Sequence, residues 1–291
     1  MNSVIKGASY VLAHTPDMVL YNGTTQTTER IVNPESEYLK EVPKHLRSYE
    51  DVVAYWPNQT YIGNAHPDQL AEIEFPYFDK KMEGAERYGK YGEIMPEEEF
   101  LLLVQACDMF EVVRLEKAFV AAHKDAFAAD PVITEDIVAL LHEGVEIDEI
   151  EALIKDDHAE PLYFEDKLVG CVKPAHDIDV NLSSHVMHEN LMSKASSVLA
   201  LLYGVKNAGI EKSDVEYVID CAEEACGDMN QRGGGNFAKA AAEIAGLSNA
   251  TGSDARGFCA APTHALIEAA ALVKSGAYKC VAVTAGGCTA K

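Results

Sequence analysis

Residues 253–287, SDARGFCAAPTHALIEAAALVKSGAYKCVAVTAGG, predict a turn, a helix and a strand in immediate succession. Gly257 allows the chain to bend, and Pro262 suits the first turn of a helix, where its missing N–H removes no hydrogen bond. Gly276 is placed to end the helix, and the apolar run YKCVAVTAGG is typical of a buried strand. A helix followed directly by a buried strand indicates an α/β unit.

The residues before this stretch extend the same pattern. The segment 183–209 predicts a long amphipathic helix that ends at Gly209, EYVIDCA at 216–222 predicts a strand, and NFAKAAAEIAGL at 236–247 predicts another helix. This alternation favours a largely parallel sheet. We expect the apolar runs 4–13, 215–221 and 279–285 to be neighbouring strands of that sheet, with helix 259–274 buried against it.

The stretch between 14 and 180 reads differently. Residues 14–95 are dense in Pro, Asn, Gly and aromatic side chains, which predicts an ordered, loop-rich segment. A helix is expected from Pro96 to about Ala129, and a second from Thr134 as its cap to Gly144 as its stop. An acidic helix at 148–160 and strands at 162–164 and 167–172 complete the segment.

Composition excludes several classes of partner. Among 291 residues, 47 are Asp or Glu and 24 are Lys or Arg, a net charge of −23 that would repel nucleic acid and anionic membranes. No apolar run approaches the roughly 18 residues of a membrane span, and the N-terminus lacks the pattern of a secretory signal. The seven cysteines are odd in number and form no CxxC pair. A reducing, cytoplasmic location is therefore expected.

Cys259 is the candidate nucleophile. It stands where a tight turn feeds into a helix, and the free N–H groups and positive dipole end of a helix N-terminus favour a thiolate. The small residues Ala260 and Ala261 leave room for a substrate. The spacing alone also fits an inert buried cysteine. Arg256 either stabilises an anionic substrate or ties the turn to an acidic side chain.

The glycine-rich turn at 226–236 is a second candidate. It is either a substrate-binding or phosphate-binding loop or a plain structural turn, and its candidate residues are Arg232, Gly233, Gly234 and Gly235. His185 and His188 have metal-like spacing, but no further ligand stands at a suitable offset, so no metal is expected. His264, five residues after Cys259 on the expected helix, is a poor general base, and Cys288 is a weaker candidate thiol.

Residues 188–291 resemble the first half of a thiolase-like enzyme, closest to the ketoacyl-ACP synthase III branch. The resemblance rests on AGIEKSDVEYVI, GGGNFAKAAAEIAGL and FCAAPTHALIEAAALVKSGAYKCVAVTAGG. It implies that Cys259 carries the acyl group, that residues 1–14 plus 181–291 form the thiolase-like half, and that 15–180 are an insertion. The activating histidine and asparagine of that family belong to a second half with no match here, so the chain is expected to be part of a longer protein.

Together with the insertion, the run ACGDMNQRGGGNFAKAAAEIAGLSNATGSDARGFCAAPTHALIEAA resembles the β subunit of component C of clostridial-type glycine reductase complexes. That family is anaerobic and cytoplasmic. The resemblance implies formation of acetyl phosphate from a carboxymethyl-selenocysteine-derived acetyl unit through a cysteine thioester. It also implies, as partners, the component C α subunit, selenoprotein A and inorganic phosphate, a homo- or hetero-oligomer, and no cofactor.

Two other functions remain open from the sequence. A β-ketoacyl synthase III-like condensing enzyme would use acyl-CoA, but the insertion is foreign to condensing enzymes. A scaffolding subunit would leave the working thiol on a partner.

Overall fold

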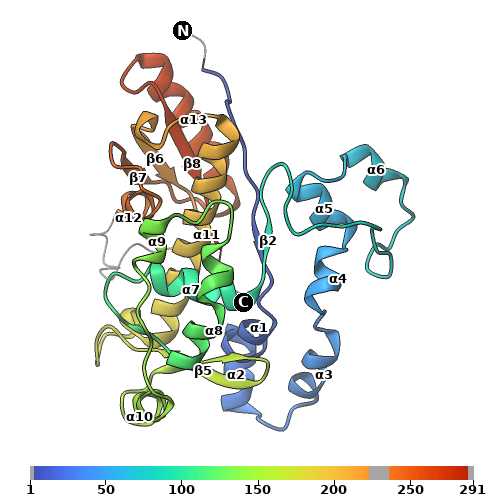
Figure 1. The fold of residues 1–291 in the computed structure, drawn as a ribbon, viewed down its shortest axis with the longest axis vertical. Coiled ribbons are helices and arrows are strands. Elements are labelled where there is room, and N and C mark those ends of the chain that lie inside the picture. Colours follow the sequence, from blue (N-terminus) through green and yellow to red (C-terminus); the bar gives the residue numbers. More distant parts are fainter. Residues whose placement is uncertain (1–2, 223–235, 288–291) are drawn as a thin grey trace.

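A parallel sheet of three strands organises the C-terminal part of the computed structural model, which describes residues 3–222 and 236–287 (Figure 1). The central strand β6 (Tyr217–Asp220) lies between β7 (Thr251–Asp254) and β8 (Val281–Thr284). Asp220 is in register with Asp254 on one side and with Thr284 on the other. The expected pairing of 215–221 with 279–285 is confirmed. β7 was missed, because Thr-Gly-Ser-Asp carries none of the apolar signal of a buried strand.

Helices cover both faces of this sheet. Val218 belongs to the main core with α11 (Ser184–Ala208) and α12 (Phe237–Ile244), whereas Ile219 packs with α13 (Ala261–Ser275). Successive side chains of a strand point to opposite faces, so α11 and α12 lie on one face and α13 on the other. Gly209 and Gly276 end α11 and α13 in the left-handed conformation, as predicted.

The expected burial of helix 259–274 is wrong for most of its length. Only Ala261 and Ala265 of α13 are buried, while Leu266 is 54% and Ile267 63% exposed. The sheet is narrow, and only the small side chains on one side of the helix face it. Much of the apolar surface of α13 is therefore open in the part of the chain that the structure describes.

The prediction that 4–13 joins this sheet is also wrong. Within that run only β1 (Leu12–Ala13) is a strand, and it pairs in parallel with β2 (Ile94–Met95). The residues before it follow α11 instead: Ser9 Oγ donates to the carbonyl of Ala200 at 2.7 Å, and Asn207 Nδ2 donates to that of Ala8 at 2.9 Å. Hydrogen bonds to residues 91–95 and to α11 thus occupy the backbone that was expected to extend the sheet.

The helix expected at 96–129 is broken in the middle. The chain forms α7 (Glu97–Ala106), then β3 (Val113–Leu115), then α8 (Lys117–Ala128). Asp108 causes the break, because its carboxylate accepts from the backbone N–H groups of Phe110 at 3.1 Å and Val113 at 2.7 Å. A short acidic side chain that captures nearby N–H groups in this way competes with the helix.

A second, antiparallel sheet has the order β3-β5-β4. Its other strands are β4 (Glu160–Phe164) and β5 (Lys167–Val172), which confirms the two strands predicted there. Thr134 caps α9 (Glu135–Val138) as expected. The helix ends at Val138 and not at Gly144, which lies in the following loop with φ 87°. The acidic helix is α10 (Ile147–Asp156).

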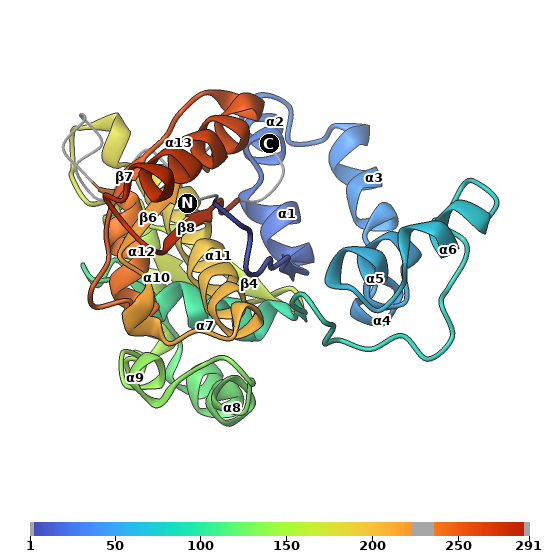
Figure 2. The same cartoon turned by 90° about the horizontal axis from the view of Figure 1, so that it is seen from above.

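The segment 14–95 holds helices where loops were expected. They are α1 (Pro16–Asn22), α2 (Thr24–Val32), α3 (Glu37–His45), α4 (Tyr49–Val53), α5 (Trp56–Ile62) and α6 (Pro67–Glu72). Proline stands in the first turn of α1, α5 and α6, where it begins a helix rather than breaking one. Helices α3–α6 stand away from the rest of the fold in both views (Figures 1 and 2). We call residues 33–92 the arm.

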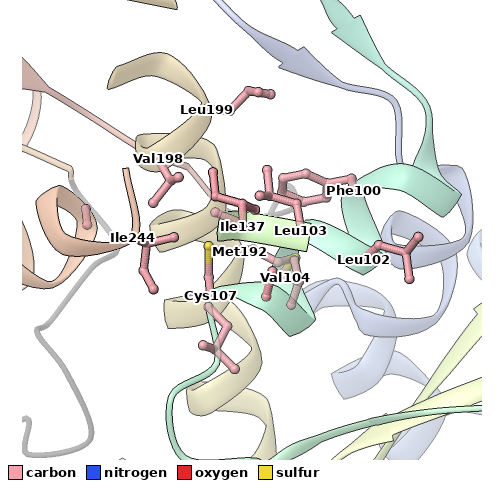
Figure 3. Packing of buried hydrophobic residues seen from close by; sticks show 14 of the residues in the cluster. Phe100, Leu102, Leu103, Val104, Cys107, Ile137, Met192, Val198, Leu199 and Ile244 are labelled. Carbon is pink, nitrogen blue, oxygen red and sulfur yellow. The ribbon is translucent and has the colours of Figure 1, made fainter. Parts of the chain in front are cut away.

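The main hydrophobic core joins parts of the chain that are far apart in sequence. Figure 3 shows Phe100, Leu103 and Val104 of α7 beside Met192 and Val198 of α11. Helices α7 and α11 thus share one core, although the sequence assigned them to the insertion and the thiolase-like half. The boundaries at 14/15 and 180/181 stay a prediction.

Candidate functional site

Cys259 lies in a short 3-10 turn, Phe258–Ala260, that leads directly into α13. Its side chain is exposed, whereas Cys107, Cys171 and Cys221 are buried and Cys280 is half-buried. Pro262 stands in the first turn of α13, which confirms the predicted helix start to within two residues. The thiol is therefore presented to solvent at the N-terminal end of a helix.

The residue before Cys259 has an uncommon backbone conformation. Phe258 has φ 49°, in the left-handed region that a bulky residue rarely adopts, and its side chain is 77% exposed. Strained backbone of this kind persists only where the surrounding structure enforces it, and it concentrates at functional sites. The strain lies one residue from the candidate nucleophile.

His264 is closer to this turn than the sequence indicated. Its Nδ1 lies 3.4 Å from where a β-carbon on Gly257 would stand, so its imidazole covers the backbone two residues before Cys259. The expectation that His264 is a poor general base treated Cys259 as part of the helix, but α13 begins only at Ala261. The offset of five residues therefore does not place the two side chains on separate faces of one regular helix.

Arg256 is bound to acidic side chains at the carboxyl edge of the sheet. Its Nη1 donates to the carboxylate of Asp220 at 2.7 Å and to the carbonyl of Ala222 at 2.9 Å, and its Nη2 lies 3.7 Å from Asp254. Of the two roles open from the sequence, these contacts match the tethering of the turn. The Arg256 side chain is still about one-third exposed, at 34%.

Asp220 is the buried centre of this edge. Its side chain accepts hydrogen bonds from Arg256, from Ser197 Oγ at 3.3 Å and from the N–H of Ala222 at 3.3 Å. Burial raises the pKa of Asp220 above its ordinary value, and the hydrogen bond and charge of Arg256 offset that rise only in part. The ion pair therefore anchors the turn before Cys259 to the central strand.

Asp254 and the turn after β8 complete the edge. The carboxylate of Asp254 accepts from the N–H groups of Phe237 at 3.0 Å and Ala238 at 2.8 Å, which caps α12. Beyond β8, a β-carbon on Gly286 would stand 1.9 Å from the carbonyl oxygen of Ser193, so only glycine allows the chain to lie against α11 there. The roles of Asp254 and Gly286 were not predicted from the sequence. For Asp254, the available signal was its place in the run Ser-Asp-Ala-Arg at 253–256.

The buried thiols have environments that suppress ionisation. Burial raises the pKa of Cys107 and of Cys171 to about 12, and that of Cys221 to about 11. Cys221 also donates its S–H to the carbonyl of Thr284 at 3.2 Å. A buried thiol with a raised pKa is a poor nucleophile, so these three act as packing residues.

His185 and His188 are joined by a carboxylate that the sequence did not associate with them. Their Nδ1 atoms lie 2.9 Å and 3.2 Å from the two oxygens of Glu160 on β4. The pair is 25 or more residues from Glu160 along the chain, so no local spacing could reveal the contact. Within residues 3–222 and 236–287, no three His, Cys, Asp or Glu side chains are grouped as ligands of a metal ion.

Several other candidates lie outside the described residues. These are Arg232, Gly233, Gly234, Gly235 and Cys288. Among the helices that the structure describes, none combines the length and the apolar character needed to cross a bilayer.

Comparison with known proteins bears on the family. No protein-family model matches the chain. Over 290 residues, 99% of its length, the chain is 62% identical to the glycine/sarcosine/betaine reductase complex component C subunit beta of Peptoclostridium acidaminophilum. The chain is therefore similar to that subunit along nearly all of its own length. It spans 56% of the length of this relative.

One solved structure is similar over a smaller region. It is the priming β-ketosynthase of the R1128 polyketide biosynthetic pathway, 26% identical, with a TM-score of 0.26 and coverage of 29% of this chain and 24% of the other. The expected α/β fold class is confirmed by the parallel sheet of this chain and by the helices that cover it.

Proposed function

We propose that this chain is the acyl-transfer part of a glycine, sarcosine or betaine reductase complex, and that Cys259 carries the acyl group. The observation that carries the proposal is the exposed Cys259 thiol in a turn between the carboxyl edge of the parallel sheet and the start of α13. Ligand and active sites of open α/β sheets gather at that edge. The name of the relative supports membership in the complex.

In the proposed reaction, the sulfur of Cys259 forms a thioester with the carboxyl carbon of a carboxymethyl selenoether, and this carbon loses one oxygen as water. The carbon–selenium bond breaks, the methylene gains a proton and becomes the methyl of the acetyl group, and selenium is left as a selenenyl sulfide with a thiol of a partner. An oxygen of inorganic phosphate then attacks the thioester carbonyl, the C–S bond breaks, and acetyl phosphate leaves while the thiolate is regenerated. A thiolate serves both steps because it is a good nucleophile and a good leaving group. The two electrons that convert the methylene to a methyl group come from selenium and that thiol, and reduction of the selenenyl sulfide back to selenol and thiol is assigned to other components, through dithiol chemistry.

The partners follow from this reaction. The component C α subunit and selenoprotein A are proposed to meet the Cys259 turn, and phosphate must reach the thioester past a chain with a net charge of −23. Arg256 is the described cation nearest in sequence to the thiol. Its side chain is 34% exposed, and we propose that it also meets an anion there, although Asp220 holds Nη1. Arg232 and the glycines 233–235 remain proposed substrate contacts.

The test uses the full-length protein in the reconstituted complex. Cys259→Ser should abolish acetyl phosphate formation, while Cys280→Ser, at a half-buried thiol away from the turn, should leave it within about twofold of the unmodified protein. Intact acetyl phosphate formation by the Cys259→Ser protein would indicate that the chain is a scaffolding subunit and that the working thiol lies on a partner. Acylation of Cys259 by acyl-CoA alone, without selenoprotein, would instead favour a condensing enzyme.

A further inference from the structure

The arm exposes aromatic side chains at its far end. Phe75 is 76% and Phe78 64% exposed, in the loop after α6, and the ring of Tyr77 packs edge-on against Phe75 with 5.2 Å between centroids. Figures 1 and 2 show that helix α6 lies well away from the body of the fold, whereas α5 approaches it through Tyr61, whose ring stacks on Tyr10. Large exposed apolar patches mark interaction sites, and aromatic side chains are more frequent in protein–protein interfaces than on the rest of a protein surface.

The arm has too small a hydrophobic core to bury these aromatic rings. Between residues 33 and 92, all of which are described, the buried apolar residues are Ile62 and Ala65. The centre of the arm is instead the buried amide of Gln59. Its Nε2 donates to the carbonyls of Val53 and Glu86 at 2.8 Å each, and its Oε1 accepts from Asn64 at 2.8 Å. A polar hub of this kind fixes the shape of the arm without burying its aromatic residues.

The base of the arm is held firmly to the body. The guanidinium of Arg87 donates to Glu93 at 2.7 Å, to Glu99 at 2.6 Å and to Asp130 at 3.2 Å, and all three carboxylates are nearly or fully buried. Tyr49 also donates its hydroxyl hydrogen to the carbonyl of Ile94 at 2.6 Å. An arm anchored in this way presents its aromatic residues in a fixed position, which lowers the entropy cost of binding.

Charge around the aromatic loop indicates the kind of partner. Glu72, Glu74 and Asp79 flank it and are exposed. The two nearby lysines are engaged locally: Lys81 pairs with Asp51, and Lys80 donates to the carbonyl of Glu74. If this loop met the same loop of a second copy of the chain, the contact would bring these three carboxylates against an identical set. Like charges across an interface are unfavourable, so a different protein is the better fit.

We propose that the loop 72–79 of the arm docks into an apolar cleft, rimmed by Lys or Arg, on another protein subunit. Phe75 and Phe78 fill the cleft, and the flanking carboxylates meet its basic rim. The inference rests on the proposed function only for the existence of partner subunits. It places a second contact with the complex on the arm, separate from the Cys259 turn.

The test measures binding of the full chain to the remaining subunits of the reductase complex, purified together and immobilised for biolayer interferometry. Phe75→Ser/Phe78→Ser should weaken binding by about thirtyfold or more, as for central aromatic residues of interfaces. The matched control is Ile178→Ser/Val180→Ser, two residues of the body that are 85% and 77% exposed, which should change the affinity by less than about threefold. Glu72→Lys/Asp79→Lys should weaken binding and reduce its dependence on salt.

Each alternative outcome overturns the proposal. Equal binding by the phenylalanine variant and the control would remove the loop from the interface. Self-association of the unmodified chain in sedimentation experiments, abolished by the same variant, would assign the loop to a contact between copies. Failure of the unmodified chain to bind any of the subunits would also overturn it. The reactivity of Cys259 is measured separately, so failure of the docking inference is distinguishable from failure of the proposed function.

Discussion

The guanidinium of Arg256 lies 2.7 Å from the carboxylate of Asp220, and this ion pair joins the turn that carries Cys259 to the central strand β6. Asp220 is fully buried, so removal of Arg256 alone would leave a buried charge without its partner and lower the stability of the fold. The carbonyl of Ala222 accepts a further hydrogen bond from the same nitrogen. The position of the thiol is therefore linked to the electrostatics of the sheet edge.

Replacement of Arg256 should be strongly destabilising. Arg256→Met leaves the carboxylate of Asp220 buried without its cation, and the free energy of unfolding should fall by about 3 kcal/mol. The double variant Arg256→Met/Asp220→Asn should recover part of that loss, because it removes the buried charge as well. Urea denaturation of the three proteins measures both effects. A loss below about 0.5 kcal/mol for Arg256→Met would mean that the pair does not anchor the turn.

The Glu160 pair with His185 and His188 predicts a pH-dependent contribution to stability. Burial alone would raise the pKa of Glu160, but the hydrogen bonds from the two histidines outweigh it and lower that pKa to about 2. The contribution of Glu160 is therefore present above its ordinary value of 4.5 and is lost as the pH falls toward 2. The hydrogen bond to Glu160 raises the pKa of His185 above 6.5, so its contribution is present below 6.5 and is lost as the pH rises through the raised value.

The two contributions coincide between about pH 4.5 and 6.5. Glu160→Gln should lower the free energy of unfolding by about 3 kcal/mol in that window, and by less on either side. The exposed carboxyl of Glu151 on α10 provides the control, because Glu151→Gln should show no such window. Unfolding by urea at a series of pH values gives the profile. A loss that is flat across the series would contradict the assignment.

The open surface of α13 predicts association. Phe258, Leu266 and Ile267 are exposed in or next to this helix, and β8 is at an edge of the described sheet. We expect the isolated chain to self-associate, or to be held by further sequence of a longer protein, with contact near residues 279–285. Leu266→Glu/Ile267→Glu should shift sedimentation toward the monomer, because it places charge on the apolar face. A stable monomer of the unmodified chain at high concentration would contradict this expectation.

In the α/β part, the sequence predicted those elements that a single local feature determines. The helix ends at Gly209 and Gly276 and the strands β6 and β8 followed from glycine and from apolar runs. It failed where tertiary contacts decided. Asp108 interrupts the helix expected at 96–129 by capturing backbone N–H groups, and residues 4–13 pair with residues 91–95 and α11 rather than with β6.

The candidate site divides in the same way. The position of Cys259 before a helix could be predicted, because Gly257 and Pro262 bracket it in the sequence. The Asp220–Arg256 pair is 36 residues apart in the chain, and the Glu160 contacts are 25 and 28 residues apart. Contacts at such separations leave no periodic signal, and they emerge only once the strands are in register.

The cysteines should differ in their reactivity toward alkylating agents. Cys259 is exposed, whereas burial raises the pKa values of Cys107 and Cys171 to about 12, so Cys259 should be alkylated before either. Iodoacetamide labelling across a pH series, followed by peptide mapping, gives the order for all seven cysteines. Earlier labelling of Cys107 or Cys221 would remove the structural basis for a catalytic Cys259.

The most direct measurement is mass spectrometry of the full complex after turnover with substrate in limiting phosphate. Without enough phosphate to release it, the acetyl group should accumulate as a thioester on the peptide that contains Cys259, and addition of phosphate should remove it and form acetyl phosphate. An acetyl group found on a cysteine of another subunit, with Cys259 unmodified, would contradict the proposed role of this chain.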